Sequence, residues 1–450
     1  MTETGAGTGT AGPDAAALLR SRNYVALLLL GAVIGVPVAA AAYFYLKAVG
    51  EAQKFVFTTL PKDLGFAGEP AWWPLLPLAL SGFVVALSIR HLPGTSGHKP
   101  AEGFKTGSRV EPADLYGILL ASLATLCLGA VLGPEAPLIA LGGGLGTLAV
   151  HLLKRDAPAT ATAVIGAAGS FAAVATLLGS PLTGAFLIME AAGLSGPMLG
   201  VILVPGLLAS GIGALIFVGL DRWTGYGTFS LAIPHIPSFT TPDAAEFLWA
   251  VVIGLVAAFL GSGIRRLALL LQPRVERRIL LLTPAAGLAV AGCAVAFGEA
   301  TGHSSSEVLF SGQSALPALV QNAAGWTVGA LVLVVLFKGL AYGISLSCFR
   351  GGPVFPSLFI GAAGGIALSH LPGLPMIAGV GMGIGAMAVA MLRLPLTSVL
   401  LASLLLASDA LALMPLVIVA VVVAYVTVAR LAPAATAQPD ADRTAKPTTA

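Results

Sequence analysis

Glu135 is the residue in this chain whose type and setting point most directly to chemistry. It stands in the stretch Gly133-Pro-Glu-Ala-Pro137, between long apolar segments. Ionisable side chains at membrane depth are costly and usually line a pathway for ions or protons. A glutamate at a helix start would compete with an anion for the unpaired backbone N–H groups there. The sequence therefore predicts that Glu135 is a gate, and the structural alternative is a glutamate that caps a helix at the interface.

The stretch around Glu135 has a counterpart in the second half of the chain. Gly133-Pro-Glu-Ala-Pro137 matches Gly352-Pro-Val-Phe-Pro356, and each is followed by a glycine nine residues after its first one, Gly142 and Gly361. Proline is favoured in the first turn of a helix, and glycine permits a sharp turn just before it. Two helix starts that converge from two halves would attract an anion through their N–H groups and dipoles.

A second pair of matching segments keeps the same order along the chain. Ala173-Val-Ala175 followed by Pro181-Leu-Thr183 matches Ala388-Val-Ala390 followed by Pro395-Leu-Thr397. Two matches in register indicate an internal duplication.

The composition requires elements that lie mostly in a membrane. Of the 450 residues, 57% are hydrophobic and 10% are charged, whereas a soluble domain carries about 25% charged residues. Since a bilayer-crossing helix needs about 20 apolar residues, we expect an all-α polytopic membrane protein. The clearest apolar segments are 24–46, 72–89, 115–132, 247–261, 279–297, 326–344 and 414–428.

Charge and composition also suggest an organisation along the chain. Arg20 and Arg22 precede the first apolar segment. The basic stretch 90–109 and the arginine tract 265–278, which is expected to be a linker, would lie on the same side of the membrane as these two arginines. By the positive-inside bias, we expect a multi-pass protein of the cell membrane with a cytoplasmic N-terminus. The expected parts are a disordered N-terminus (1–20), a first membrane half (21–220), a linker loop (221–245), a second membrane half (246–432) and a disordered tail (433–450).

Other chemistry has little support in the sequence. The three cysteines lie in or beside apolar segments without CxxC spacing, and the histidines have no metal-ligand spacing. No nucleophile and base occur together in one apolar region. We therefore expect no metal, no cofactor, no enzymatic activity and no nucleic-acid partner.

Taken in order, the motifs resemble those of the CLC family of chloride channels and chloride/proton antiporters, of the prokaryotic type without a C-terminal cytoplasmic domain. The first-half stretch is similar to the family's GxEGP segment, with Glu135 at the gating glutamate and Ala136 in place of the usual glycine. The resemblance runs from about residue 90 to 415. Its other segments are 95–103 (similar to GSGIP and the acidic residue and glycine after it), 181–190 (PLAGxxFxxEE), 351–361 (GGIFAPSLFIG) and 393–397 (RAPLT).

The resemblance implies a CLC-like fold of about eighteen helices of unequal length in two inverted-topology repeats, with one pore in each subunit of a homodimer. It implies transport of chloride or a related halide past a displaceable Glu135, either passive or coupled to proton antiport. The anion-binding residues that it implies are Ser96, Gly97, Gly133, Ala136 and Gly352, with backbone N–H groups near Val354 and Phe355.

The sequence also departs from the family pattern. Exchangers of the family often carry a second, inward-facing glutamate, whose place here is Ala191, so that Glu190 is the remaining candidate for a proton pathway. The late tyrosine that donates a hydroxyl to the central anion has no clear counterpart. Pro353 removes one backbone donor. Lys99 either raises the local anion concentration or is an exposed interfacial lysine.

These departures leave several functions open. Beside a proton-coupled exchanger, the chain could be a passive chloride channel, a fluoride exporter or a secondary transporter of another solute. The retained Ser96 favours chloride over fluoride. A cation-driven transporter would need more carboxylates or amides at mid-membrane than the sequence offers.

Overall fold

The computed structural model describes residues 20–104, 110–195, 197–225, 231–234, 239, 241–407 and 410–432. The two expected tails, apart from Arg20, and a part of the expected linker loop lie outside these residues. The described part is built of helices. In order they are α2 (Arg22–Lys54), α3 (Leu60–Asp63), α4 (Leu75–His91), α5 (Asp114–Cys127), α6 (Glu135–Leu153), α7 (Ala159–Leu178), α8 (Pro181–Ala191), α9 (Pro197–Thr224), α10 (Ala244–Arg277), α11 (Ile279–Thr301), α12 (Ala315–Gln321), α13 (Val328–Cys348), α14 (Val354–Leu368), α15 (Met376–Leu392), α16 (Pro395–Leu406) and α17 (Ala410–Leu431).

Helices of two lengths make up the membrane part. Eight described helices are long and apolar enough to cross a bilayer by length and composition, α10 and α13 among them. Six apolar helices, among them α14, have only 10–17 residues. A helix shorter than about 20 residues does not cross the bilayer unaided. Its ends at membrane depth must meet protein or a water-lined cavity, and the start of α14 does so at the site described below.

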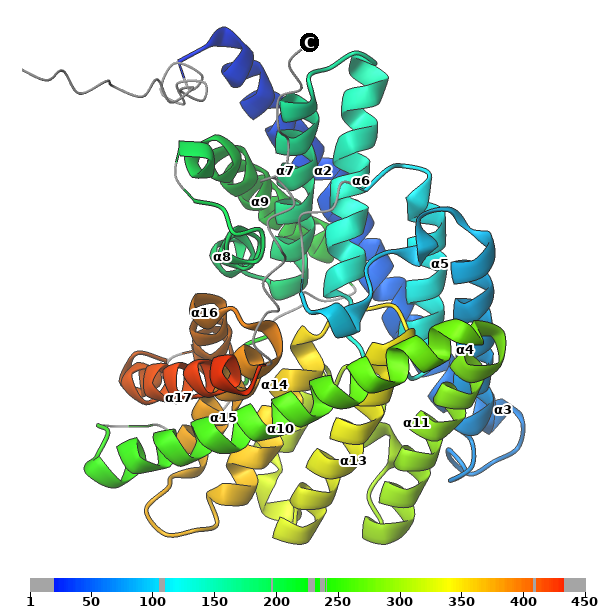
Figure 1. Cartoon of the computed structure of the whole chain (residues 1–450), viewed down its shortest axis with the longest axis vertical. Coiled ribbons are helices and arrows are strands. Elements are labelled where there is room, and N and C mark those ends of the chain that lie inside the picture. Colours follow the sequence, from blue (N-terminus) through cyan, green and yellow to red (C-terminus); the bar gives the residue numbers. More distant parts are fainter. Residues whose placement is uncertain are drawn as a thin grey trace, which may run out of the picture.

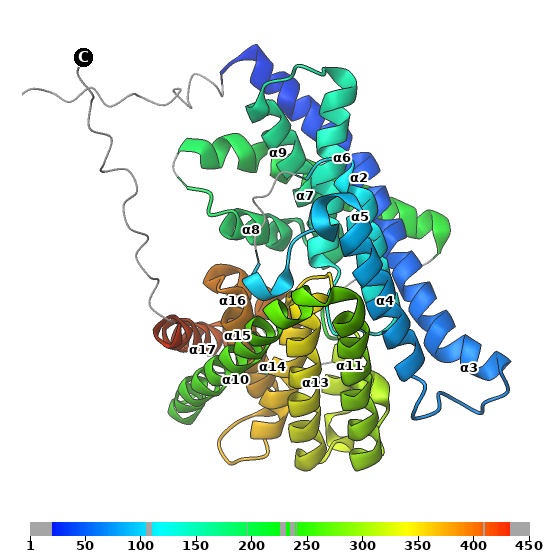
Figure 2. The same cartoon turned by 45° about the vertical axis from the view of Figure 1, so that its right-hand side comes forward.

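The later helices of the two halves occupy different parts of the molecule. In Figures 1 and 2, α6 to α9 lie in the upper part of the view and α13 to α17 in the lower part. The halves are joined where α4 packs on α11 and where α8 packs on α16. The expected all-α polytopic membrane architecture is confirmed for the described residues.

Equivalent glycines bring the matching helix pairs together in the two halves. A methyl group added to Gly142 of α6 would collide with the carbonyl of Gly169 in α7. In the same way, a methyl group added to Gly361 of α14 would collide with the carbonyl of Gly383 in α15. Small residues allow this close backbone approach of membrane helices. The packing of α6 on α7 therefore repeats in α14 on α15, as the duplicated sequence indicates.

The arginine tract 265–278 does not form the linker that we expected. Helix α10 continues through it to Arg277, and α11 begins at Ile279. Ala268 and Val275 keep a buried stripe through these turns, while Arg274 and Arg277 are exposed. The prediction is wrong because a helix can extend beyond the apolar layer when one face still packs and the other carries charge.

One lysine is fully buried in the second half. The Lys338 ammonium of α13 donates hydrogen bonds to the carbonyls of Glu307, Val308, Leu309 and Phe310 at 2.9, 3.2, 2.9 and 3.4 Å. It also lies 4.5 Å from the ring centre of Phe359 in α14. These bonds hold the loop after α11 against α13, so Lys338 has a structural role.

Candidate functional site

The two GPxxP stretches meet in the structure. Gly133 and Gly352 form an antiparallel bridge, in which the N–H of Gly133 donates to the carbonyl of Gly352 at 2.8 Å and the N–H of Gly352 donates to the carbonyl of Gly133 at 2.6 Å. Helix α6 begins two residues after one glycine, and α14 begins two residues after the other. The duplicated sequence thus brings two helix N-termini to one point inside the protein.

The side chain of Glu135 fills the space between these helix starts. It is fully buried, and its Oε1 accepts a hydrogen bond from the backbone N–H of Phe355 at 2.9 Å. The backbone N–H groups of Val354 and of Glu135 itself also face the carboxylate, and Oε2 has no hydrogen-bond partner among the described residues. Helix N-termini attract anions through these N–H groups and the helix dipole, so the carboxylate occupies a place that suits a free anion.

The glycines beside Glu135 are needed for its position. A methyl group added to Gly133 or to Gly352 would overlap the Glu135 carboxylate oxygens. The backbone therefore approaches the carboxylate from two sides, as glycine alone permits.

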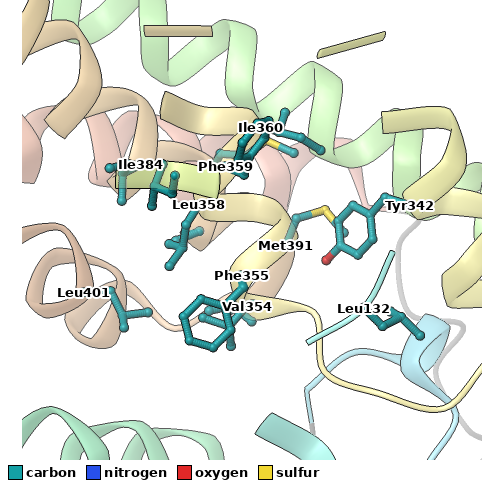
Figure 3. Close-up of a cluster of buried hydrophobic side chains, with 14 of the residues drawn as sticks. Leu132, Tyr342, Val354, Phe355, Leu358, Phe359, Ile360, Ile384, Met391 and Leu401 are labelled. Carbon is teal, nitrogen blue, oxygen red and sulfur yellow. The ribbon is translucent and has the colours of Figure 1, made fainter. Parts of the chain in front are cut away.

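A buried tyrosine supports the start of α14 from α13. The Tyr342 hydroxyl donates to the carbonyl of Pro353 at 2.7 Å, and its side chain is fully buried. Figure 3 shows this hydroxyl directed toward the turn that leads to Val354 and Phe355, within an apolar cluster that includes Leu132. No local pattern around Tyr342 indicates this contact, because Pro353 lies in the turn that follows the helix.

Ser96 lies in a short, left-handed segment of the backbone. Thr95 and Ser96 have φ values of 48° and 58°, between Gly94 at 69° and Gly97 at 91°. Non-glycine residues in this region cost about 1–3 kcal/mol each and cluster at functional sites. Ser96 is 1% exposed, and its Oγ has no hydrogen-bond partner among the described residues. A buried hydroxyl without a partner is suited to donate to a ligand.

Ser96 faces a cavity of about 310 Å³. The cavity is lined by Gly97 and Ala136 as well, and by Pro137, Gly351 and Pro353, which flank the helix starts. It therefore ends against the two helix N-termini that hold Glu135. A charged residue that the sequence analysis missed, Arg350, also lines it. The sequence feature that could have indicated it is an arginine directly before Gly351 and Gly352, next to the second GPxxP stretch.

The structure places Glu190 elsewhere. Its carboxylate accepts hydrogen bonds from the backbone N–H of Leu396 at 3.0 Å and from the N–H and Oγ1 of Thr397 at 2.7 and 2.6 Å. Glu190 of α8 therefore caps the start of α16 and is not among the residues that line the cavity. This contact joins the two halves through the duplicated Pro-Leu-Thr segment.

The region beside the cavity carries an ion pair. The ammonium of Lys99 lies 2.7 Å from the carboxylate of Glu276 in α10, and both side chains are partly exposed. Among the described residues, no group of three or more histidine, cysteine, aspartate or glutamate side chains comes together to hold a metal ion.

Comparison with known proteins agrees with this geometry. Residues 82–429 match the family described as "Voltage gated chloride channel". A protein of Escherichia coli O17:K52:H18 (strain UMN026 / ExPEC) named "Putative ion-transport protein YfeO" is 26% identical over 379 residues, which cover 83% of this chain and 86% of that protein.

Two solved structures share the fold. A slow cyanobacterial Cl⁻/H⁺ antiporter superposes with a TM-score of 0.72 at 21% identity, over 90% of this chain and 94% of that one. A CLC-type fluoride/proton antiporter superposes with a TM-score of 0.65 at 20% identity, over 89% of this chain and 95% of that one. With two helix starts that meet at a buried glutamate and a family match that covers most of its length, the chain belongs to the CLC family of voltage gated chloride channels.

Proposed function

We propose that this protein transports chloride and related small anions across the cell membrane along a path gated by Glu135, in exchange for protons. The observation that carries the proposal is the position of the Glu135 carboxylate, which is fully buried and bound by the N–H of Phe355 between two helix N-termini. An anion that takes this place must displace the carboxylate. A carboxylate that leaves it can take up a proton.

The cavity supports an anion path toward Glu135. The Ser96 hydroxyl, which lacks a hydrogen-bond partner among the described residues, lines the cavity. Gly97 and Ala136 also line it, and their small side chains leave room for an anion. Backbone and hydroxyl donors hold an anion without fixing it too tightly for transport. Gly133, Gly352, Val354 and Phe355 belong to the same proposed binding region through the backbone around the Glu135 carboxylate.

A passive chloride pathway is the second candidate. Ala191 stands where exchangers of the family often have a glutamate, and the carboxylate of Glu190 is engaged by the start of α16. Both features weaken a carboxylate route for protons from the inner side. Exchange then requires water to carry protons through the inner cavity.

The proposal includes a homodimer with the N-terminus in the cytoplasm. The dimer is supported by the family resemblance, and the orientation by Arg20 and Arg22 before the first span. Cross-linking in native membranes and protease access to a tag at the N-terminus test these two points separately.

The deciding experiment measures chloride efflux from liposomes that contain the purified chain while external pH is recorded. The variants are Glu135→Gln and Glu135→Ala, and the control is Glu69→Gln, at a carboxylate that instead binds Ser305 and Ser306 in a loop contact. For an exchanger, protons move against chloride in the wild type and in the control. In both Glu135 variants chloride still moves and proton movement stops.

The other outcomes are equally specific. Chloride movement without proton movement in the wild type selects the passive pathway. Fluoride movement without chloride movement selects a fluoride exporter. If neither halide moves, or if the Glu135 variants behave like the wild type, the proposed role of this site is wrong.

A further inference from the structure

The cavity that leads to Glu135 contains a buried cation outside the predicted set of anion-binding residues. Arg350 lies between the end of α13 and the start of α14, two residues before Gly352. It is 6% exposed and lines the cavity together with Ser96. A buried arginine is stable only when its charge and its N–H groups are satisfied.

Only some of the N–H donors of this guanidinium have hydrogen-bond partners among the described residues. Nη1 donates to the carbonyls of Cys348 and Phe349 at 3.5 and 3.3 Å, and Nη2 donates to the carbonyl of Thr95 at 3.4 Å. Nε has no hydrogen-bond partner among the described residues. Of the five N–H donors of a guanidinium, one on Nε and one on Nη2 are left over by these bonds. Nε and Nη2 share one edge of the planar guanidinium, and such an edge binds a carboxylate or another planar anion with two parallel hydrogen bonds.

Nearby carboxylates do not occupy that edge. Glu276 and Glu102 interact with Arg350 through charge. The carboxylate of Glu276 is nevertheless paired with the ammonium of Lys99, at 2.7 Å. A second arginine, Arg265 of α10, has its Nη2 3.7 Å from the position that a methyl group on Gly103 would take, beside the same cavity. Arg350 and Arg265 thus place two positive charges at the cavity, whose lining also includes the carboxylate of Asp114.

Thr95 connects Arg350 to Ser96. The carbonyl of Thr95 accepts from Arg350, and the next residue along the strained segment is Ser96, whose buried Oγ also lacks a partner. Two unpartnered buried donors, one charged and one neutral, thus line the same cavity from chain segments far apart in sequence.

We propose that Arg350 is an anion-binding residue of this protein, which holds a monovalent anion in the cavity with its Nε–Nη2 edge, together with the Ser96 hydroxyl. The inference deepens the proposed function and rests on it. A formal charge here supplies binding strength at an inner site that lacks the late tyrosine hydroxyl of the family. The forked edge also favours a planar oxoanion such as nitrate, which it meets with two bonds, over a spherical halide.

The test is calorimetric titration of the purified full-length protein in detergent with sodium chloride and, separately, sodium nitrate. The variants are Arg350→Gln and Arg350→Lys. The control is Arg274→Gln, which removes the same charge from an exposed position of α10 whose bond is to its own helix. We expect Arg350→Gln to weaken the binding of both anions by about tenfold or more, as for the loss of a hydrogen bond to a charged group.

The lysine variant separates charge from fork geometry. We expect Arg350→Lys to retain more chloride binding than nitrate binding, and Arg274→Gln to bind both anions like the wild type. Unchanged binding in a monodisperse Arg350→Gln protein overturns the proposal, as does an equal loss in Arg274→Gln. If the wild type transports chloride in liposomes while Arg350→Gln binds normally, the inference fails and the proposed function stands. If the wild type transports no anion, the proposed function fails.

A second measurement needs no variant, in case Arg350→Gln does not fold. Crystals of the wild type grown in sodium bromide should show an anomalous peak within hydrogen-bond distance of Nε of Arg350 and of Oγ of Ser96. A bromide that lies elsewhere in the cavity, or a cavity without bromide while the crystals hold it at other sites, overturns the proposal.

Discussion

Replacing Gly352 with alanine should open the Glu135 gate while residue 135 remains a glutamate. The methyl group of the new residue would overlap the Glu135 carboxylate, and the three atoms nearest to it all belong to Glu135. The backbone of Gly352 is not in the left-handed region, so alanine fits its conformation. The carboxylate must therefore leave the place where Phe355 holds it.

The size of the effect follows from the bond that is lost. A hydrogen bond to a charged group contributes about 1.5–3 kcal/mol. Since about 1.4 kcal/mol is a factor of ten in an equilibrium, the carboxylate should occupy its place about 10- to 150-fold less in Gly352→Ala. Wild-type chloride flux should rise on acidification, because protonation releases the carboxylate, whereas Gly352→Ala flux should hardly depend on pH.

The assay is chloride efflux from liposomes across a series of external pH values, with proton movement recorded in parallel. The matched control is Gly364→Ala, which makes the same change in α14 where a methyl group meets nothing within 4 Å. Gly364→Ala should retain the pH dependence and any proton coupling of the wild type. Gly352→Ala should resemble Glu135→Ala in both properties.

A double variant tests whether the clash is with Glu135 and nothing else. Gly352→Ala combined with Glu135→Gly removes every atom among the nearest contacts of the new methyl group. It should therefore behave like Glu135→Gly alone. The steric reasoning is refuted if Gly352→Ala keeps the wild-type pH dependence, or if the double variant loses stability that neither single variant loses.

Three further predictions concern binding and stability. Ser96→Ala should weaken chloride binding by about tenfold or more, because it removes a hydrogen bond to a charged ligand. The control in the same titration is Ser88→Ala, which loses only a bond to its own helix. Lys338→Met leaves four carbonyls, two of them in buried contacts, without their donor and should destabilise the protein by about 3 kcal/mol or more. It should lower the melting temperature in detergent far more than Lys99→Met, and equal shifts would contradict its structural role. Burial raises the pKa of Glu69 above its ordinary value, so the folded state binds this proton more tightly than the unfolded state. Between those two pKa values the stability should fall as pH rises, and a melting-temperature series should show a smaller fall in Glu69→Gln.

The main features of the site could be predicted from sequence because they are written as local patterns. The glycine and proline spacing predicted two helix starts, their repetition predicted that both halves contribute, and a lone glutamate within one of them predicted a gate position. Each inference depends on residues a few positions apart, where backbone preference and hydrogen-bonding capacity act directly.

The predictions that failed or were missed depend on contacts between distant segments. The arginine tract 265–278 has the charge of a loop, yet the buried stripe of α10 keeps it helical. The contact of the Glu190 carboxylate with the start of α16 was likewise not foreseen, and the predicted place of Glu190 in a proton pathway stays a prediction. A charge pattern does not say which partner lies opposite.

Composition and the duplicated motifs by themselves determined a helical membrane protein with two related halves and a glutamate at their junction. Only the tertiary structure decided that Gly352 crowds that glutamate, that the Tyr342 hydroxyl fixes the turn at Pro353, and that Arg350 shares a cavity with Ser96. Sequence determines what each residue offers, in charge, donors and backbone freedom. The meeting of residues more than 200 positions apart is set by the packing of whole helices, which no local pattern records.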